Sequence, residues 1–141
     1  MKRSIMARAF SGLPLLLGGT GIMAGAVLPW MTLLAGLHPL RGIIGLNGKL
    51  LFGVGAICFL AGVTLIARPM KTHLLPASFG FAGAAVTVMT AWLIGGMQVM
   101  QADLARNPMT LAQPGPGLLV AAAGGVMVTL MLLVPAARSR A

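Results

Sequence analysis

The side chains that most often catalyse reactions or bind metals are scarce in this chain. It has one acidic residue, Asp103, one cysteine, Cys58, and two histidines, His38 and His73. A nucleophile needs a base beside it, and a metal ion needs several histidine, cysteine or carboxylate ligands. Cys58 lies within an apolar stretch, where a packing role is expected. We therefore expect that the protein is not an enzyme, with no catalytic residue, no metal ion and no other cofactor.

Two further groups of residues have a possible chemical role, and each also has a simpler structural explanation. Asp103 and Arg106 are three residues apart, so they can pair across one helical turn, and Asp103 can alternatively meet a basic residue of a partner. Thioethers bind Cu(I), and Met97, Met100 and Gln101 fall near one helix face. Methionine is also an ordinary apolar filler, and the chain has 11 of them. We favour self-pairing for the first grouping and packing for the second.

Charge and hydropathy exclude a typical soluble domain. Hydrophobic residues make up 58% of the chain and charged residues 8%, whereas a soluble domain has about 25% charged residues. The formal net charge is +9, but the basic residues lie between and outside the apolar runs and are not interleaved with aromatics. We therefore expect a lipid bilayer around the protein and no nucleic-acid partner.

Four apolar runs have the length of membrane-spanning helices, at about residues 13–30, 50–67, 74–97 and 117–134. A helix rises about 1.5 Å per residue, so about 18 residues span about 27 Å, close to the hydrocarbon thickness of a bilayer. The third helix is expected to continue two turns past residue 97, until Asn107 and Pro108 stop it. The sequence thus predicts an all-α, polytopic membrane protein with four transmembrane helices in a single domain, residues 1–141.

The basic residues predict the orientation of these helices. Seven of the 10 lysines and arginines fall on one side and three on the other, and cytoplasmic segments hold the excess. Both termini are therefore expected in the cytoplasm, and the two histidines on opposite faces of the membrane. The basic N-terminus also resembles a signal peptide, but apolar residues continue to Trp30, so a retained first helix is expected. The predicted location is a bacterial inner (cytoplasmic) membrane.

The first outer connection, residues 31–49, is too apolar for a solvated loop and has too many glycines and prolines for one helix. An interfacial or partly re-entrant segment is expected there, although a solvated loop at the depth of the lipid headgroups is the simpler alternative. The residues near the outer face that are polar, charged or aromatic are candidates for contact with lipid or a partner: Trp30, His38, Arg41, Lys49, Trp92, Asp103 and Arg106.

Small residues recur at spacings of four within the apolar runs, which favours close packing of helices in lipid. The candidates are Gly21 and Gly25, Gly80 and Ala84, and the series Gly117, Ala121 and Gly125. They can pack the four helices on one another or on a second membrane subunit. A weak repeat is also present, because residues 10–69 and 74–137 each read as a helix, an outer loop and a glycine-initiated helix. A sequence of low complexity can also look repetitive without a true internal duplication.

Three short sequences resemble small bacterial four-helix membrane proteins of unassigned function. They are LPW at residues 28–30, the pattern GxxGxxGK from Gly42 to Lys49, and PGPGLLVAAAGG at residues 114–125. Many such proteins have an acidic residue in the first loop, where this chain has Arg41, Asn47 and Lys49. The resemblance implies a four-helix topology and no particular activity.

Two functions remain after these exclusions. The first is a non-catalytic integral membrane subunit that packs against other membrane protein subunits of a larger complex, with a structural, assembly or accessory role. The second is a homo-oligomeric pore or small-solute carrier, for which Thr20, Thr64, Thr87 and Thr129 are candidate lumen residues. Small four-helix drug/proton exchangers have a glutamate in the first helix, and this chain has none there.

Overall fold

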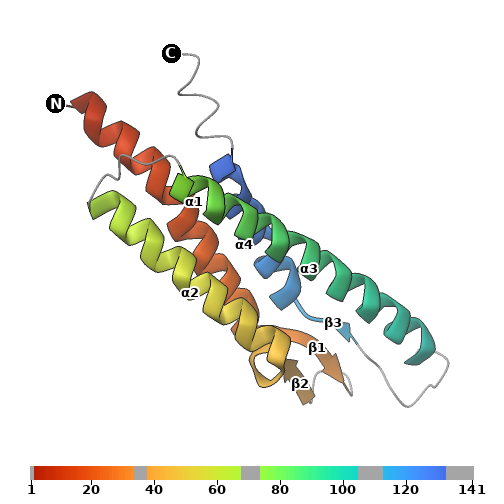
Figure 1. The fold of residues 1–141 in the computed structure, drawn as a ribbon. Helices are drawn as coiled ribbons and strands as arrows, with labels where there is room; N and C mark the ends of the chain where they lie inside the picture. Colours follow the sequence, from red (N-terminus) through yellow and green to blue (C-terminus); the bar gives the residue numbers. More distant parts are fainter. Residues whose placement is uncertain (1, 34–37, 68–73, 105–112, 133–141) are drawn as a thin grey trace.

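The fold consists of four long helices with a small sheet at one end (Figure 1). The computed structural model describes residues 2–33, 38–67, 74–104 and 113–132. The helices are α1 (Lys2–Val27), α2 (Leu46–Ala67), α3 (Leu74–Leu104) and α4 (Gly117–Thr129). Helix α1 packs on α2 and α4, and α4 also packs on α3, whereas α2 and α3 scarcely touch. The helices therefore follow the order α2–α1–α4–α3, with α1 and α4 in the middle.

The mostly helical fold confirms the all-α class, but several helix limits differ from the prediction. Helix α1 begins at Lys2 instead of residue 13 and ends at Val27 instead of Trp30. Pro29 explains this end, because the residue before a proline is disfavoured in helical conformation. Helix α3 continues through Leu104, as expected. Helix α4 changes after Thr129 into a short 3-10 helix, η2 (Leu130–Leu132).

The sheet was not predicted. Strands β1 (Pro29–Leu33) and β2 (His38–Arg41) form an antiparallel pair, and β3 (Gln113–Pro114) pairs with the other edge of β1. The 3-10 helix η1 (Gly42–Ile44) leads from β2 into α2. The expected irregular connection at residues 31–49 is thus a strand pair, a 3-10 turn and the first turn of α2, with residues 34–37 outside the described part.

Helices α1 and α2 pack through a repeat of glycines at seven-residue intervals. The buried residues of α2 are Gly48, Leu51, Gly55, Cys58 and Gly62, which follow a 3-4 alternation. Gly12 and Gly19 repeat at the same interval on α1 and are also buried. A Cβ placed on Gly19 would lie 2.6 Å from the Phe59 nitrogen and 2.7 Å from the Gly55 oxygen. Backbone therefore meets backbone along this contact, as in glycine-rich membrane helix pairs.

Helix α1 packs on α4 through a second set of small residues. A Cβ on Gly18 would lie 2.7 Å from the Gly124 oxygen, and a Cβ on Gly25 would lie 2.6 Å from the Gly117 oxygen. The contact between α3 and α4 is also close, because a Cβ on Gly83 would lie 2.7 Å from the Thr129 nitrogen. The two central helices are therefore held by backbone contacts on both sides.

The outer helices are long, apolar and largely exposed. Two segments are long and apolar enough to cross a membrane, Leu46–Ala67 and Ser78–Asp103, and in each of them 22% of an apolar 18-residue window is buried. They belong to α2 and α3. The apolar parts of the central helices, Gly12–Val27 and Gly117–Thr129, are shorter. Large apolar side chains such as Ile57, Leu60 and Phe81 are more than half exposed.

Candidate functional site

Trp30 connects four elements at the sheet end of the protein. The strand pairing shifts register between Pro29 and Met31, so Trp30 is the extra residue of a bulge, a feature that re-aims side chains. Its side chain is only 8% exposed and belongs to the core cluster that includes Leu118 of α4. A Cβ on Gly42 of η1 would collide with the indole ring. Glycine at that position is therefore needed for the ring to lie where it does.

The indole also completes the hydrogen bonding of α1. The Trp30 Nε1–H donates to the Gly25 oxygen over 2.9 Å, in a buried position. In a continuing helix the donor to this oxygen would be the N–H of the residue four positions on, which is Pro29 and has none. The side chain of Trp30 thus replaces the missing backbone donor. The Trp30 oxygen in turn accepts a hydrogen bond from the Gly115 N–H over 2.8 Å, which ties the entry of α4 to β1.

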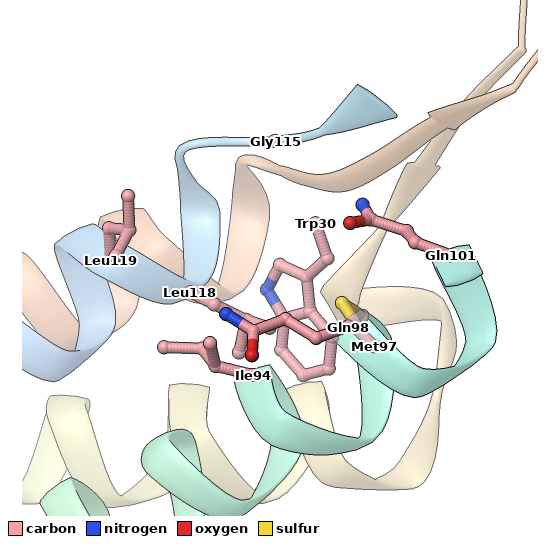
Figure 2. A pocket seen from close by; sticks show the side chains of 8 residues that line it. All are labelled: Trp30, Ile94, Met97, Gln98, Gln101, Gly115, Leu118 and Leu119. Atoms are coloured by element: carbon pink, nitrogen blue, oxygen red, sulfur yellow. The ribbon is translucent and has the colours of Figure 1, made fainter. Parts of the chain in front are cut away.

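A cavity of about 230 Å³ opens beside Trp30, between the end of α3 and the start of α4 (Figure 2). Most of its wall is apolar, and the two polar side chains are glutamines of α3. Gln98 is exposed at the rim, and the Nε2 atom of Gln101 is buried without a hydrogen-bond partner. The described lining residues are Trp30, Ile94, Met97, Gln98, Gln101, Gly115, Leu118 and Leu119.

An apolar groove of about 310 Å³ lies between the first half of α2 and the middle of α3. It exists because α2 packs on α1 and α3 packs on α4, which leaves few contacts between the facing sides of α2 and α3 in the described part of the chain. The small side chains of Ala82 and Ala85 widen it on the α3 side. The described lining residues are Leu50, Leu51, Val54, Ala82, Ala85, Val86 and Met89, and none of them is polar.

Most of the predicted small-residue candidates lie in contacts within the chain. Gly21 and Gly25 face Gly124, Gly117 and Ala121 between α1 and α4, and Gly125 faces Thr87 of α3. Gly80 is buried and Ala84 is partly buried on α3. The predicted packing candidates rested on four-residue spacings, so the seven-residue series of Gly12 and Gly19 on α1 and of Gly55 and Gly62 on α2 was missed. Gly48 continues the α2 series but lies against Gly42. The seven-residue repeat is visible in the sequence and predicts the α1–α2 contact.

The candidates for lipid or partner contact are placed differently from one another. Trp92 is 74% exposed, and Arg41, Lys49 and Asp103 are also exposed. Trp30 was expected among residues facing lipid or a partner, but its ring is enclosed by the protein's own elements. The reason is the bulge, which turns the ring toward the helices. His38 lies in β2, and its side chain is outside the described part, as are Arg106 and the expected pair of Arg106 with Asp103.

The candidate lumen threonines do not gather on one surface. Thr87 and Thr129 lie at the contact between α3 and α4, whereas Thr20 and Thr64 are exposed on α1 and α2. Each hydroxyl donates to a carbonyl of its own helix, for example Thr20 to the Leu16 oxygen over 2.7 Å and Thr129 to the Gly125 oxygen over 2.8 Å. Bonds of this kind satisfy hydroxyl donors in apolar surroundings.

The described part of the chain holds no group of three or more histidine, cysteine or acidic residues that could bind a metal ion. Comparison of the sequence and fold with protein families, curated proteins and solved structures finds no match. The coarse class is a mostly helical protein with two helices that have the length and composition of membrane spans. The groove and the Trp30 cavity are its two candidate sites.

Proposed function

We propose that the protein is a multi-pass membrane subunit with four spans and no catalytic role, which packs against another membrane protein through the α2–α3 groove. The apolar groove carries this proposal. Its walls belong to the two helices that have the length and composition of membrane spans, and its described lining offers a ligand no hydrogen bond. The occupant that fits these features is a transmembrane helix of a partner, because a helix inserts its side chains between two neighbouring helices.

The lengths and the arrangement of the helices support the proposal of four membrane spans. Helix α2 has 22 residues, or about 33 Å, enough to cross the hydrocarbon core alone. The apolar part of α1 (Gly12–Val27) and the α4 helix with η2 are each about 25 Å long. These two shorter helices lie between α2 and α3, and both keep exposed apolar side chains, such as Leu17 at 50% and Leu119 at 65%. A bilayer accommodates such a shortfall at a modest energetic cost.

Exposed apolar surface supports the membrane location itself. Soluble monomers rarely expose contiguous apolar patches larger than a few hundred Å². On α2, the exposed large apolar side chains extend from Leu46, at 73%, to Ile66, at 39%. The strip of α2 that packs on α1 is narrow, because much of it consists of glycines, which have no side chain to widen the contact.

Fluorescence quenching by brominated phospholipids should separate the two tryptophans. Trp92 is 74% exposed and Trp30 8% exposed, so bromines on acyl chains reach the first ring and not the second. The wild-type protein in such bilayers is expected to lose most of its Trp92 emission. The Trp92→Phe variant, which retains only Trp30, should be quenched far less. Equal quenching in the two proteins, or none in either, would contradict the proposed placement in lipid.

Two exposed alanines of α3 provide a matched test of the groove. Ala85 lines the groove, whereas Ala91 lies about 120° away around the helix. A photoreactive amino acid at residue 85 should cross-link in native membranes to one discrete membrane protein, and the same group at residue 91 should label lipid. Ala85→Trp fills the groove and should lower co-isolation of that cross-linked protein at least about tenfold, while Ala91→Trp should not.

The cross-linked product also decides between the two candidate functions. A product that contains a second copy of this chain would support the homo-oligomeric pore or carrier and overturn the accessory-subunit proposal. Labelling of lipid alone at residue 85 would show that the groove holds no protein.

A further inference from the structure

We propose that the cavity beside Trp30 binds the carbonyl-bearing head of a neutral, apolar molecule, with Gln101 as its hydrogen-bond donor. The site is separate from the α2–α3 groove, and it does not depend on a partner protein. Its ligand chemistry is a carbonyl oxygen on an apolar body. Two membrane components have it, the ester group of a diacyl lipid and the ring of a quinone.

The Gln101 amide is the first observation. Its Nε2 atom is buried and has no hydrogen-bond partner. A buried donor without an acceptor is destabilising, and such groups are rare in folded proteins. In Figure 2 the amide of Gln101 extends from α3 toward Trp30 and the segment around Gly115 that joins β3 to α4, on the cavity side of the helix. An acceptor placed in the cavity would therefore satisfy it.

The wall of the cavity defines the rest of the ligand. The ring of Trp30 forms one side, and Ile94, Met97 and Leu118 add further apolar surface. None of the described lining residues has a formal charge, which favours a neutral acceptor over a carboxylate or phosphate. Several water molecules fit in about 230 Å³, but each needs two to four polar partners, and this wall offers few.

The size and place of the cavity indicate which part of a ligand enters. Pockets for drug-sized ligands usually measure about 300–1,000 Å³, so a cavity of about 230 Å³ takes a head group and leaves an acyl or isoprenoid tail outside. The cavity lies where α3 changes from apolar to polar, since Gln98, Gln101 and Asp103 follow one another within its last two turns. Within the proposed membrane subunit this is the depth of the lipid–water interface.

The start of α4 adds a favourable field. The helix begins at Gly117 without a side-chain cap, and its first turn includes the lining residues Leu118 and Leu119. The N-terminal end of a helix has a partial positive charge, which attracts the oxygen of a polarised carbonyl. A carbonyl between Gln101 and this helix end would meet a donor on one side and a positive field on the other.

The test uses the Trp92→Phe protein, in which Trp30 is the only fluorophore. A short-chain benzoquinone should quench Trp30 saturably and raise the melting temperature. Ester-linked dioleoyl phosphatidylcholine should raise the melting temperature relative to its dialkyl ether analogue, which lacks the carbonyls. The first result identifies a quinone site and the second a lipid-ester site. If neither probe has an effect, the proposal is wrong.

Gln101→Leu removes the donor and keeps a similar volume. It should weaken the effective probe about tenfold, the value of one buried hydrogen bond. The same change should raise the melting temperature of the protein without ligand, because it removes an unpaired buried donor. The matched control, Gln98→Leu at the exposed rim, should change both values less. If Gln101→Leu and Gln101→Met both bind the probes as tightly as the wild type, Gln101 is not the donor and the proposal is overturned.

Discussion

Gly19→Ala is expected to lower the free energy of unfolding by about 1–3 kcal/mol, whereas Gly53→Ala is expected to raise it by up to about 1 kcal/mol. Both substitutions add one methyl group to a helical glycine. A Cβ on Gly19 would lie within 3.0 Å of backbone atoms of Gly55 and Phe59 on α2. Backbone cannot move aside as a flexible side chain does, so α1 and α2 must separate. A Cβ on Gly53 meets nothing within 4 Å, so only its better helix propensity remains.

The measurement is the thermal midpoint of each purified variant in one detergent, compared with the wild type. The informative feature is the opposite sign of the two shifts, because a general effect of alanine on helices would move both in the same direction. Gly95→Ala is a further control on α3, since nothing lies within 4 Å of its added methyl group. A Gly19→Ala protein as stable as the Gly53→Ala protein would show that α1 and α2 are not in the close contact described.

The helices of this protein could be predicted because their signals are local. The apolar runs ended by prolines and glycines predicted four helices, and the polar residues after position 97 correctly predicted a longer α3. The glycine spacing indicated close helix packing, within the chain or on a second subunit, and in the structure Gly25 lies against Gly117. It was harder to predict which helices are neighbours, because a glycine indicates that another helix comes close but does not indicate which helix that is. Predicting the contact between α1 and α2 required pairing the seven-residue glycine series of one helix with that of the other.

The sheet and the two candidate sites could not be predicted for a different reason. Strand β3 pairs with β1 across about 80 positions of sequence, and its two residues, Gln113 and Pro114, have no strand pattern of their own. The position of Trp30 depends on a bulge within that sheet. The cavity then depends on Trp30, the end of α3 and the start of α4 at once. In the sequence Gln101 shares one helix face with Met97 and Met100, and only the packed structure shows that its Nε2 atom is buried.

Trp30→Ala is expected to lower the free energy of unfolding by about 3–5 kcal/mol, the range for large aromatic residues removed from a core. The ring is 8% exposed, and it lies between Gly42 of η1 and the first turn of α4. Its loss would merge its own volume with the neighbouring cavity of about 230 Å³. The Gly25 oxygen would also lose its only described donor, because Pro29 has no N–H to replace the indole.

Two matched variants separate these contributions in a comparison of thermal or denaturant unfolding. Trp30→Phe keeps most of the apolar ring but leaves the Gly25 oxygen without its donor, so a loss of about 1–3 kcal/mol is expected. Trp92→Ala removes the same side chain from a position that is 74% exposed, and it should change stability by about 0.5 kcal/mol or less. The expected order of stability is therefore Trp92→Ala, Trp30→Phe and Trp30→Ala, from highest to lowest. If Trp30→Phe were as stable as the wild type, the indole N–H would not be the cap of α1, and packing alone would explain the burial of Trp30.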